Sequence, residues 1–192
     1  MFLVLHGQTE WNRVRRMQGQ RDSALTEEGR RQARSVGDLL KARLDAPPRI
    51  IASPLGRAQA TAQIVAACLD VPADAIETDE RLKELGFGAW EGLTREEIAE
   101  GWGVRSDDRM HNEWVFQAPD GETYEALAAR LGEWLAAQTE PEGLIAVSHG
   151  VASRVLRGLY AGLSKADALA LEVSRDTAYR LRRGQITELK AS

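Results

Sequence analysis

The sequence predicts an α/β protein, a three-layer α/β/α sandwich in which a mostly parallel sheet lies between two layers of helices. Short apolar runs, typical of strands buried on both faces, alternate along the chain with amphipathic segments of helical period. The order strand, helix, strand, helix favours this architecture over an all-α or all-β fold. The chain has 192 residues, which fits a single domain over residues 1–192.

The first half of the chain supplies two strand–helix pairs. Residues 1–5 form an apolar run, and Thr26 is a candidate N-cap for a helix that stops before the Pro47–Pro48 pair. Residues 49–52 read as a second buried strand, and a second helix is expected from about Gly56 to Leu69. These two pairs predict the first half of the sandwich.

The second half begins less regularly and then returns to the same alternation. Residues 79–121 carry little periodicity, which predicts a flap or lid inserted in the domain, with a capping box at Thr94 that starts a short helix ending near Gly101. The remaining expected elements are an edge strand at 75–78, helices at 122–137 and 151–161, and strands at 144–147, 169–174, 177–182 and 185–190.

Composition excludes several classes of function. The chain is 43% hydrophobic and 28% charged, with a net charge of −4, so neither nucleic acid nor an anionic membrane is an expected partner. Cys68 is the sole cysteine, which rules out an internal disulfide, and no metal-ligand spacing is present, so we expect no metal. No apolar run reaches 18 residues and no signal peptide is recognisable, which predicts a cytoplasmic protein. Its oligomeric state, monomer or homodimer, is left open by the sequence.

Candidate functional residues follow three predicted strands. His6-Gly7 and His149-Gly150 come directly after apolar runs, and Ser53-Pro54 follows a third, with Arg57 one turn into the next helix. Ligands collect at the carboxyl ends of parallel strands, and Arg and helix amino ends both favour phosphate there. Glu84, in a loop flanked by glycines, is positioned to bring a carboxyl group to the rim. Two His, an Arg and a Glu suit covalent phosphoryl transfer through histidine.

These motifs together resemble those of the histidine phosphatase superfamily, which includes the cofactor-dependent phosphoglycerate mutases. The start of the chain, Leu3-x-x-His6-Gly7-x-Thr9-x-Trp11-Asn12, is similar to the Arg-His-Gly motif of that superfamily. Further matching blocks follow in the family's order and cover most of the chain: Arg16-Met17-Gln18-Gly19, Asp22 with Leu25-Thr26 and Gly29, Gln32-Ala33, Ser53-Pro54-Leu55 with Arg57-Ala58, Glu84-Leu85-Gly86-Phe87-Gly88, Trp90-Glu91-Gly92, Gly121-Glu122-Thr123 and Ser148-His149-Gly150.

The resemblance implies a phosphoglycerate mutase-like fold and a role for each matching residue. His6 is the implied nucleophile, Arg57 and His149 hold the phosphoryl oxygens, and Asn12 adds a hydrogen bond. Glu84 is the implied general acid and then general base. A neutral nucleophile beside a cationic His149 predicts that the two imidazole pKa values are pushed apart.

Further expectations concern the pocket and its ligand. Arg16, Gln18 and Gly19 are expected to line the phosphate pocket. The resemblance implies no metal or other cofactor, and a small-molecule phosphomonoester as the substrate. The identity of that substrate cannot be read from the flap.

One position departs from the family pattern. Leu5 stands where the family has an Arg that contacts the phosphate. Loss of one charge-assisted hydrogen bond costs roughly 1.5–3 kcal/mol, or about one to two decades in rate. Three outcomes are open: a slow enzyme, a protein that binds phosphate without turnover, or an intact enzyme in which a neighbouring cation substitutes. The candidates for that cation are Arg13, Arg16, Arg21 and Arg81.

The leading interpretation is therefore a metal-independent phosphomonoester hydrolase that acts through phospho-His6. A phosphoglycerate mutase is the first alternative, although the span from Glu84 to Gly121 is shorter than mutases of this family usually have. A non-catalytic phospho-ligand-binding protein, suggested by Leu5, is the second.

Overall fold

A single mixed sheet organises the protein, whose computed structural model describes residues 1–104, 113–139 and 141–191. The order of its strands is β3-β2-β4-β1-β5-β6. The first four run parallel to one another, and β5 and β6 are antiparallel to their neighbours. The predicted mostly parallel sheet is thus confirmed. The strands are β1 Phe2–Leu5, β2 Arg49–Ala52, β3 Glu77–Thr78, β4 Leu144–Ser148, β5 Thr177–Arg182 and β6 Gln185–Lys190.

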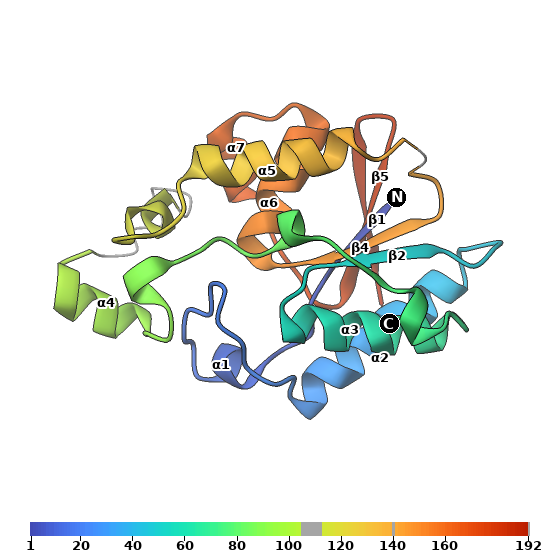
Figure 1. The fold of residues 1–192 in the computed structure, drawn as a ribbon, viewed down its shortest axis with the longest axis horizontal. Helices are drawn as coiled ribbons and strands as arrows, with labels where there is room; N and C mark the ends of the chain where they lie inside the picture. Colours follow the sequence, from blue (N-terminus) through green and yellow to red (C-terminus); the bar gives the residue numbers. More distant parts are fainter. Residues whose placement is uncertain (105–112, 140, 192) are drawn as a thin grey trace.

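Helices cover both faces of the sheet, as predicted (Figure 1). Helices α2 (Glu27–Lys41) and α3 (Gly56–Cys68) pack together on one face. Helices α5 (Tyr124–Ala136) and α6 (Gly150–Ala161) cover the other. The remaining helical segments are α1 Glu10–Arg13, η1 Ala73–Ala75, η2 Glu80–Leu82, η3 Gly88–Trp90, α4 Arg95–Trp102, η5 Glu113–Gln117 and α7 Lys165–Ala170.

Alternation along β1 explains how one strand serves both layers. Phe2 and Val4 belong to the hydrophobic cluster under α2 and α3, whereas Leu3 and Leu5 belong to the cluster under α5 and α6. All four side chains are buried, as a central strand requires. The apolar run at the start of the chain is therefore a strand with two buried faces, which leaves only its end free to carry function.

The segment predicted as a flap contains short helices in its described parts. The capping box at Thr94 is confirmed, because its hydroxyl accepts from the Glu97 N–H while the Glu97 carboxylate accepts from the Thr94 N–H. Helix α4 then extends away from the sheet (Figure 1). The rings of Trp90 and Trp114 stack with centroids 5.8 Å apart and anchor the segment to the core. His111, the histidine of this segment, lies outside the described residues.

One predicted strand is wrong. Residues 169–174 were expected to form a strand, but Lys165–Ala170 is helix α7 and the residues that follow it are in no strand. The Ser164 hydroxyl accepts from the Asp167 N–H and starts the helix, which packs on α6. The hairpin that joins β5 to β6 is confirmed, with positive φ at both Arg183 and Gly184.

Helices long and apolar enough to span a bilayer are absent from the described residues.

Candidate active site

Three neighbouring strands bring the predicted site residues to one edge of the sheet. β2, β4 and β1 are adjacent and parallel, so their carboxyl ends meet. Backbone hydrogen bonds continue past the strands, from His6 N to the Ser148 oxygen at 3.1 Å and from Ser53 N to the Val147 oxygen at 2.9 Å. His6, Ser53 and His149 therefore lie side by side, as the repeated strand-end motifs predicted.

His6 is held as a neutral ring with one free nitrogen. Its side chain is buried, and Nδ1 lies 2.8 Å from the carbonyl oxygen of Gly7. A carbonyl only accepts hydrogen bonds, so Nδ1 carries the proton and Nε2 the lone pair. Burial, reinforced by the positive charges of Arg57 and Arg175, lowers the pKa of His6 well below its usual range. The ring is therefore neutral at neutral pH, with its Nε2 unprotonated, as a nucleophile requires.

His149 lies against the His6 ring, with 5.2 Å between the ring centroids. Its Nε2 is 2.7 Å from the hydroxyl oxygen of Ser53, and its Nδ1 is buried with no hydrogen-bond partner among the described residues. His149 is itself fully buried and lies behind Gly150 and Val151, which line the same cavity as His6 and Arg57 whereas His149 is not among its lining residues.

The pKa values of the two histidines shift in the same direction, whereas a neutral His6 beside a cationic His149 was expected. Burial, with the nearby charge of Arg57, lowers the pKa of His149 as well. The ring nitrogen that has a partner faces a hydroxyl group rather than a carboxylate, so nothing there offsets the burial. Both rings are therefore neutral at neutral pH.

Arg57 is fixed at the amino end of α3 by the loop before α2. Its Nη1 donates to the Arg21 carbonyl at 2.6 Å and to the Asp22 carboxylate at 3.1 Å, and its Nη2 donates to the Gly19 carbonyl at 2.7 Å. Nε is buried without a partner in the described part of the chain. The guanidinium is therefore oriented by three bonds and still has donors left for an anion.

Glu84 is anchored by backbone N–H groups at the start of α6. Its Oε1 accepts from Leu85 at 3.0 Å and from Ala152 at 2.9 Å, and its Oε2 accepts from Val151 at 3.2 Å. The side chain is buried and lines the same cavity as His6 and Arg57. The loop with flanking glycines thus places a carboxyl group at the site, as predicted.

The four expected pocket residues all line this cavity of about 180 Å³, in different ways. Asn12 accepts from the Thr9 N–H through Oδ1 and so also caps α1, which leaves its amide nitrogen for a ligand. The Gln18 oxygen accepts from the Thr9 hydroxyl, and Gly19, at φ +55°, presents its carbonyl to Arg57. Arg16 forms a two-contact ion pair with Glu97, so its charge is largely balanced.

Three arginines that the sequence did not single out also line the cavity: Arg95, Arg154 and Arg175. Arg95 lies over the Trp114 ring, and Nε of Arg154 donates to the Leu171 carbonyl at 2.7 Å. Among the described residues that line the cavity, these three arginines, Arg16 and Arg57 face one acid, Glu84. This excess of positive charge suits an anionic ligand. No motif pointed to these three residues, which lie on separate elements.

The remaining cations proposed to substitute for Leu5 do not reach the cavity. Arg13 pairs with Glu10, Arg81 pairs with Asp79, and Arg21 extends to 3.8 Å from Glu91 with 65% of its side chain exposed. Among these candidates only Arg16 lines the cavity, already paired.

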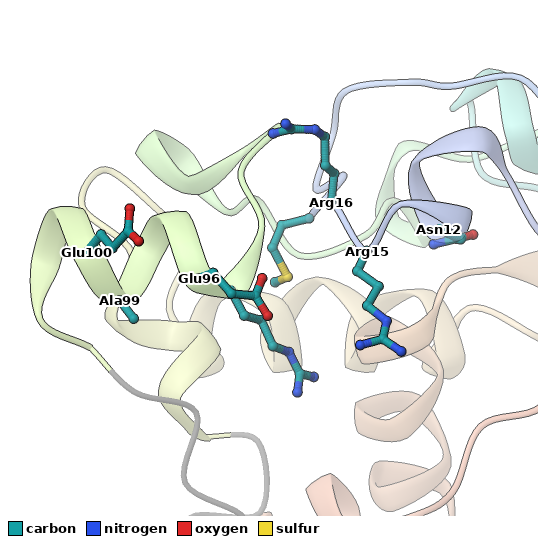
Figure 2. A pocket seen from close by; sticks show the side chains of 8 residues that line it. Asn12, Arg15, Arg16, Glu96, Ala99 and Glu100 are labelled. Carbon is teal, nitrogen blue, oxygen red and sulfur yellow. The ribbon is translucent and has the colours of Figure 1, made fainter.

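A larger groove of about 840 Å³ adjoins the cavity and shares Asn12, Arg16, Met17 and Arg95 with it. Figure 2 shows Asn12 and Arg15 on one side of this groove and Glu96, Ala99 and Glu100 of α4 on the other. Its charges are mixed, unlike those of the cavity. Within the described residues, no group of three His, Cys, Asp or Glu side chains is arranged to hold a metal ion.

Comparisons with known proteins agree with this geometry. The family model of the histidine phosphatase superfamily (branch 1) matches residues 1–185. A probable phosphoglycerate mutase, GpmB, of Enterobacter sp. (strain 638) is 41% identical over 171 residues, which are 85% of this chain and 75% of that protein.

Two solved structures show the same fold. A mycobacterial glucosyl-3-phosphoglycerate phosphatase, solved with VO3, has a TM-score of 0.79 at 30% identity, over 94% of this chain and 90% of that one. A putative α-ribazole-5′-P phosphatase of Escherichia coli K-12 has a TM-score of 0.78 at 23% identity, over 100% and 95% of the two chains.

Proposed function

The chain belongs to branch 1 of the histidine phosphatase superfamily, and within that family we propose that it hydrolyses phosphomonoesters through a phosphohistidine intermediate on His6. The observation that carries the proposal is the hydrogen bond from His6 Nδ1 to the Gly7 carbonyl. It leaves Nε2, with its lone pair, as the reactive nitrogen of a buried and neutral ring beside Arg57.

The proposed reaction has two steps. In the first, His6 Nε2 attacks phosphorus, a P–N bond forms, the bond from phosphorus to the leaving oxygen breaks, and the carboxylic acid of Glu84 gives that oxygen a proton. In the second, the Glu84 carboxylate takes a proton from water, whose oxygen attacks phosphorus and breaks the P–N bond. Inorganic phosphate leaves, and both His6 and Glu84 return to their starting states.

Positive charge and hydrogen-bond donors would stabilise the phosphoryl group as it is transferred. Arg57 has N–H groups to spare, and the amide nitrogen of Asn12 lines the same cavity. Nδ1 of His149 is free to take up a proton as the phosphate dianion arrives, because a nearby anion favours the charged imidazole. No step in this scheme requires a metal ion.

The substrate we propose is a small phosphorylated metabolite with a polar leaving group. The cavity of about 180 Å³ suits a phosphoryl group, and the adjoining groove gives the rest of the molecule polar surroundings of both signs. The named activities of the structural neighbours, toward glucosyl-3-phosphoglycerate and α-ribazole-5′-P, are both removals of phosphate from such molecules.

A phosphoglycerate mutase is the second candidate, favoured by the name of the GpmB relative. A mutase would need its histidine phosphorylated by a bisphosphoglycerate before it could transfer the group. Activity toward 3-phosphoglycerate should therefore be measured with and without that primer. Formation of 2-phosphoglycerate only when the primer is present would favour the mutase; release of phosphate without it would favour the hydrolase.

The test of the proposal is hydrolysis of p-nitrophenyl phosphate by the wild type and His6→Asn, followed by quenching in alkaline denaturant and gel analysis of phosphoprotein. We expect turnover in the wild type only, and a phosphoryl label on His6 that is lost in acid and kept in alkali. Turnover that survives His6→Asn would exclude the phosphohistidine. Phosphate binding without turnover in the wild type would instead support the third candidate, a phospho-ligand-binding protein.

A further inference from the structure

Position 5 offers no charge to a bound phosphate. The Leu5 side chain is 3% exposed and belongs to the hydrophobic cluster under α5 and α6, together with Leu3 and Leu85. A proposed phosphatase site that lacks a cation at this strand end needs one from elsewhere to match the charge of a phosphoryl dianion.

The loop before β5 brings Arg175 to the same place. β5 runs antiparallel beside β1, with Val4 paired to Ala178. The same register carried one residue further sets Leu5 opposite Thr177, so the residues just before β5 lie beside the strand end that carries His6. Arg175 is two residues before β5 and lines the cavity with His6, Arg57 and Glu84.

The side chain of Arg175 is not held in place by other side chains of the described residues. Its Nε is buried with no hydrogen-bond partner, and no ion pair or side-chain hydrogen bond involves it among the residues that the structure describes. Arg154 and Arg57, which line the same cavity, are each held by hydrogen bonds to carbonyl groups. A buried N–H donor without a partner is costly, and an anion in the cavity would supply one.

Electrostatics agree with this position. The charge of Arg175 contributes to lowering the pKa of His6, and the carboxylate of Glu84 acts in turn on Arg175, whose own pKa is lowered by burial. Arginine nevertheless stays protonated at neutral pH. Arg175 is therefore a permanent positive charge close to the nucleophile and to the proposed acid.

We propose that Arg175 binds the phosphoryl group together with Arg57, and so takes the place of the cation that Leu5 cannot provide. The proposal rests on the proposed function of the same site. Arg175 would donate N–H groups to non-bridging phosphoryl oxygens, and these bonds would strengthen as negative charge develops during transfer. No bond to Arg175 forms or breaks, so it acts in both steps as a fixed charge.

The experiment compares Arg175→Gln and Arg175→Lys with the wild type, with Arg180→Gln as the matched control. Arg180 lies on β5, is exposed, and is not among the residues that line the cavity. Two quantities are measured: kcat/KM for p-nitrophenyl phosphate, and the Kd of inorganic phosphate by calorimetry. Inorganic phosphate has no leaving group, so its Kd reports on phosphoryl contacts alone. Circular dichroism and Tm confirm that each variant is folded.

We expect Arg175→Gln to lower kcat/KM by about 10- to 100-fold and to weaken phosphate binding by about tenfold, because one charge-assisted contact is lost. Arg175→Lys should lose less, and Arg180→Gln should stay within about twofold of the wild type. If Arg175→Gln leaves both quantities unchanged, the proposal is overturned, and a contact from Arg175 to the leaving group would be the remaining explanation for its position.

A second arm tests whether positions 5 and 175 serve the same contact. Leu5→Arg alone should bring no gain, whereas Leu5→Arg added to Arg175→Gln should restore activity by about tenfold. A folded double variant no more active than Arg175→Gln would overturn this exchange of roles.

Failure of the proposed function can be told apart from failure of the proposed role of Arg175. If His6→Asn is as active as the wild type, the phosphohistidine is excluded, whatever Arg175→Gln does. If the wild type is inactive, the phosphate Kd still decides whether Arg175 binds the anion.

Discussion

The Nδ1 atom of His6 and the carbonyl oxygen of Gly7, the next residue along the chain, lie 2.8 Å apart. Two consecutive residues thus determine which ring nitrogen is free to react. This position requires glycine, because a Cβ atom there would be 2.2 Å from the carbonyl oxygen of Gly29. The tautomer of His6 therefore depends on close contact between the end of β1 and the start of α2.

Stability should fall in mild acid because two histidines are buried in the neutral form. In the folded protein the pKa values of His6 and His149 are both lowered from 6.5, chiefly by burial. The unfolded chain takes up protons first, so their contribution to stability is complete above about pH 6.5 and is lost as the pH falls toward the folded-state values. Each ring then contributes a slope of up to about 1.4 kcal/mol per pH unit.

Urea denaturation between about pH 7.5 and 5.5 measures this effect. His149→Gln, which removes one of the two rings, should show a shallower decline of the unfolding free energy than the wild type. Equal slopes in the two proteins would contradict neutral burial of His149.

Ser53→Ala should lower kcat by about tenfold with little change in KM, because His149 loses the 2.7 Å hydrogen bond that orients its ring. Ser53 is a positioning residue, so the NMR shifts of the His149 ring nitrogens should move as well. Ser153→Ala is the matched control: its hydroxyl is also buried, on α6, and has no hydrogen-bond partner within the described residues. A loss of kcat equal in both variants would show a general packing effect instead.

The residues that the sequence located well are those that follow strands. His6, Ser53 and His149 each come after an apolar run, and the carboxyl ends of neighbouring parallel strands meet, so their convergence could be predicted before any coordinates. Glu84 was predicted from its glycine-flanked loop, and the resemblance to the family's motif implied its role. The carboxylate of Glu84 is held by the backbone N–H groups of Val151 and Ala152, which lie 67 and 68 residues further along the chain. No local sequence pattern predicts these contacts.

Arg175 could not be predicted for a different reason. Arg175 reaches the site because β5 pairs antiparallel with β1. These two strands are far apart in the sequence, and no local pattern around Arg175 indicates that they pair. The mistaken strand at 169–174 also obscured it, because that strand would have made Arg175 part of an ordinary turn. The pKa of His149 was misjudged because its environment depends on Ser53, a hydroxyl contributed by another strand end.

Asp22→Asn should weaken both catalysis and folding. The Asp22 carboxylate accepts from the Arg57 side chain at 3.1 Å and from the backbone N–H groups of Gly56 and Arg57 at the start of α3. Its replacement loosens the guanidinium and removes a negative charge from a helix amino end. We expect kcat/KM to fall about tenfold and the unfolding free energy by about 1 kcal/mol.

Steady-state kinetics and urea denaturation test this prediction for Asp22. Asp70→Asn is the control, since it removes a carboxylate that is paired with Lys41 and 81% exposed. Both quantities should be close to wild type in that variant. A fall in kcat/KM of the same size in Asp70→Asn would mean that the effect of Asp22→Asn comes from net charge and not from the contact with Arg57.

Glu84→Gln should separate the two steps of the proposed reaction. Glutamine cannot donate a proton to a leaving oxygen or take one from water, and loss of general acid–base catalysis costs about 10²–10⁴-fold in rate. The nitrophenolate of p-nitrophenyl phosphate leaves without a proton, so the first step with this substrate should survive while the second becomes slow. A burst of one nitrophenolate per enzyme, followed by slow turnover, is the expected result in rapid-mixing experiments. An alkyl phosphate, whose leaving group needs the proton, should give no burst.

Glu125→Gln, an exposed change on α5, should behave as wild type. If Glu84→Gln slows both substrates equally and shows no burst, Glu84 does not protonate the leaving group, and its buried carboxylate serves chiefly to hold the start of α6.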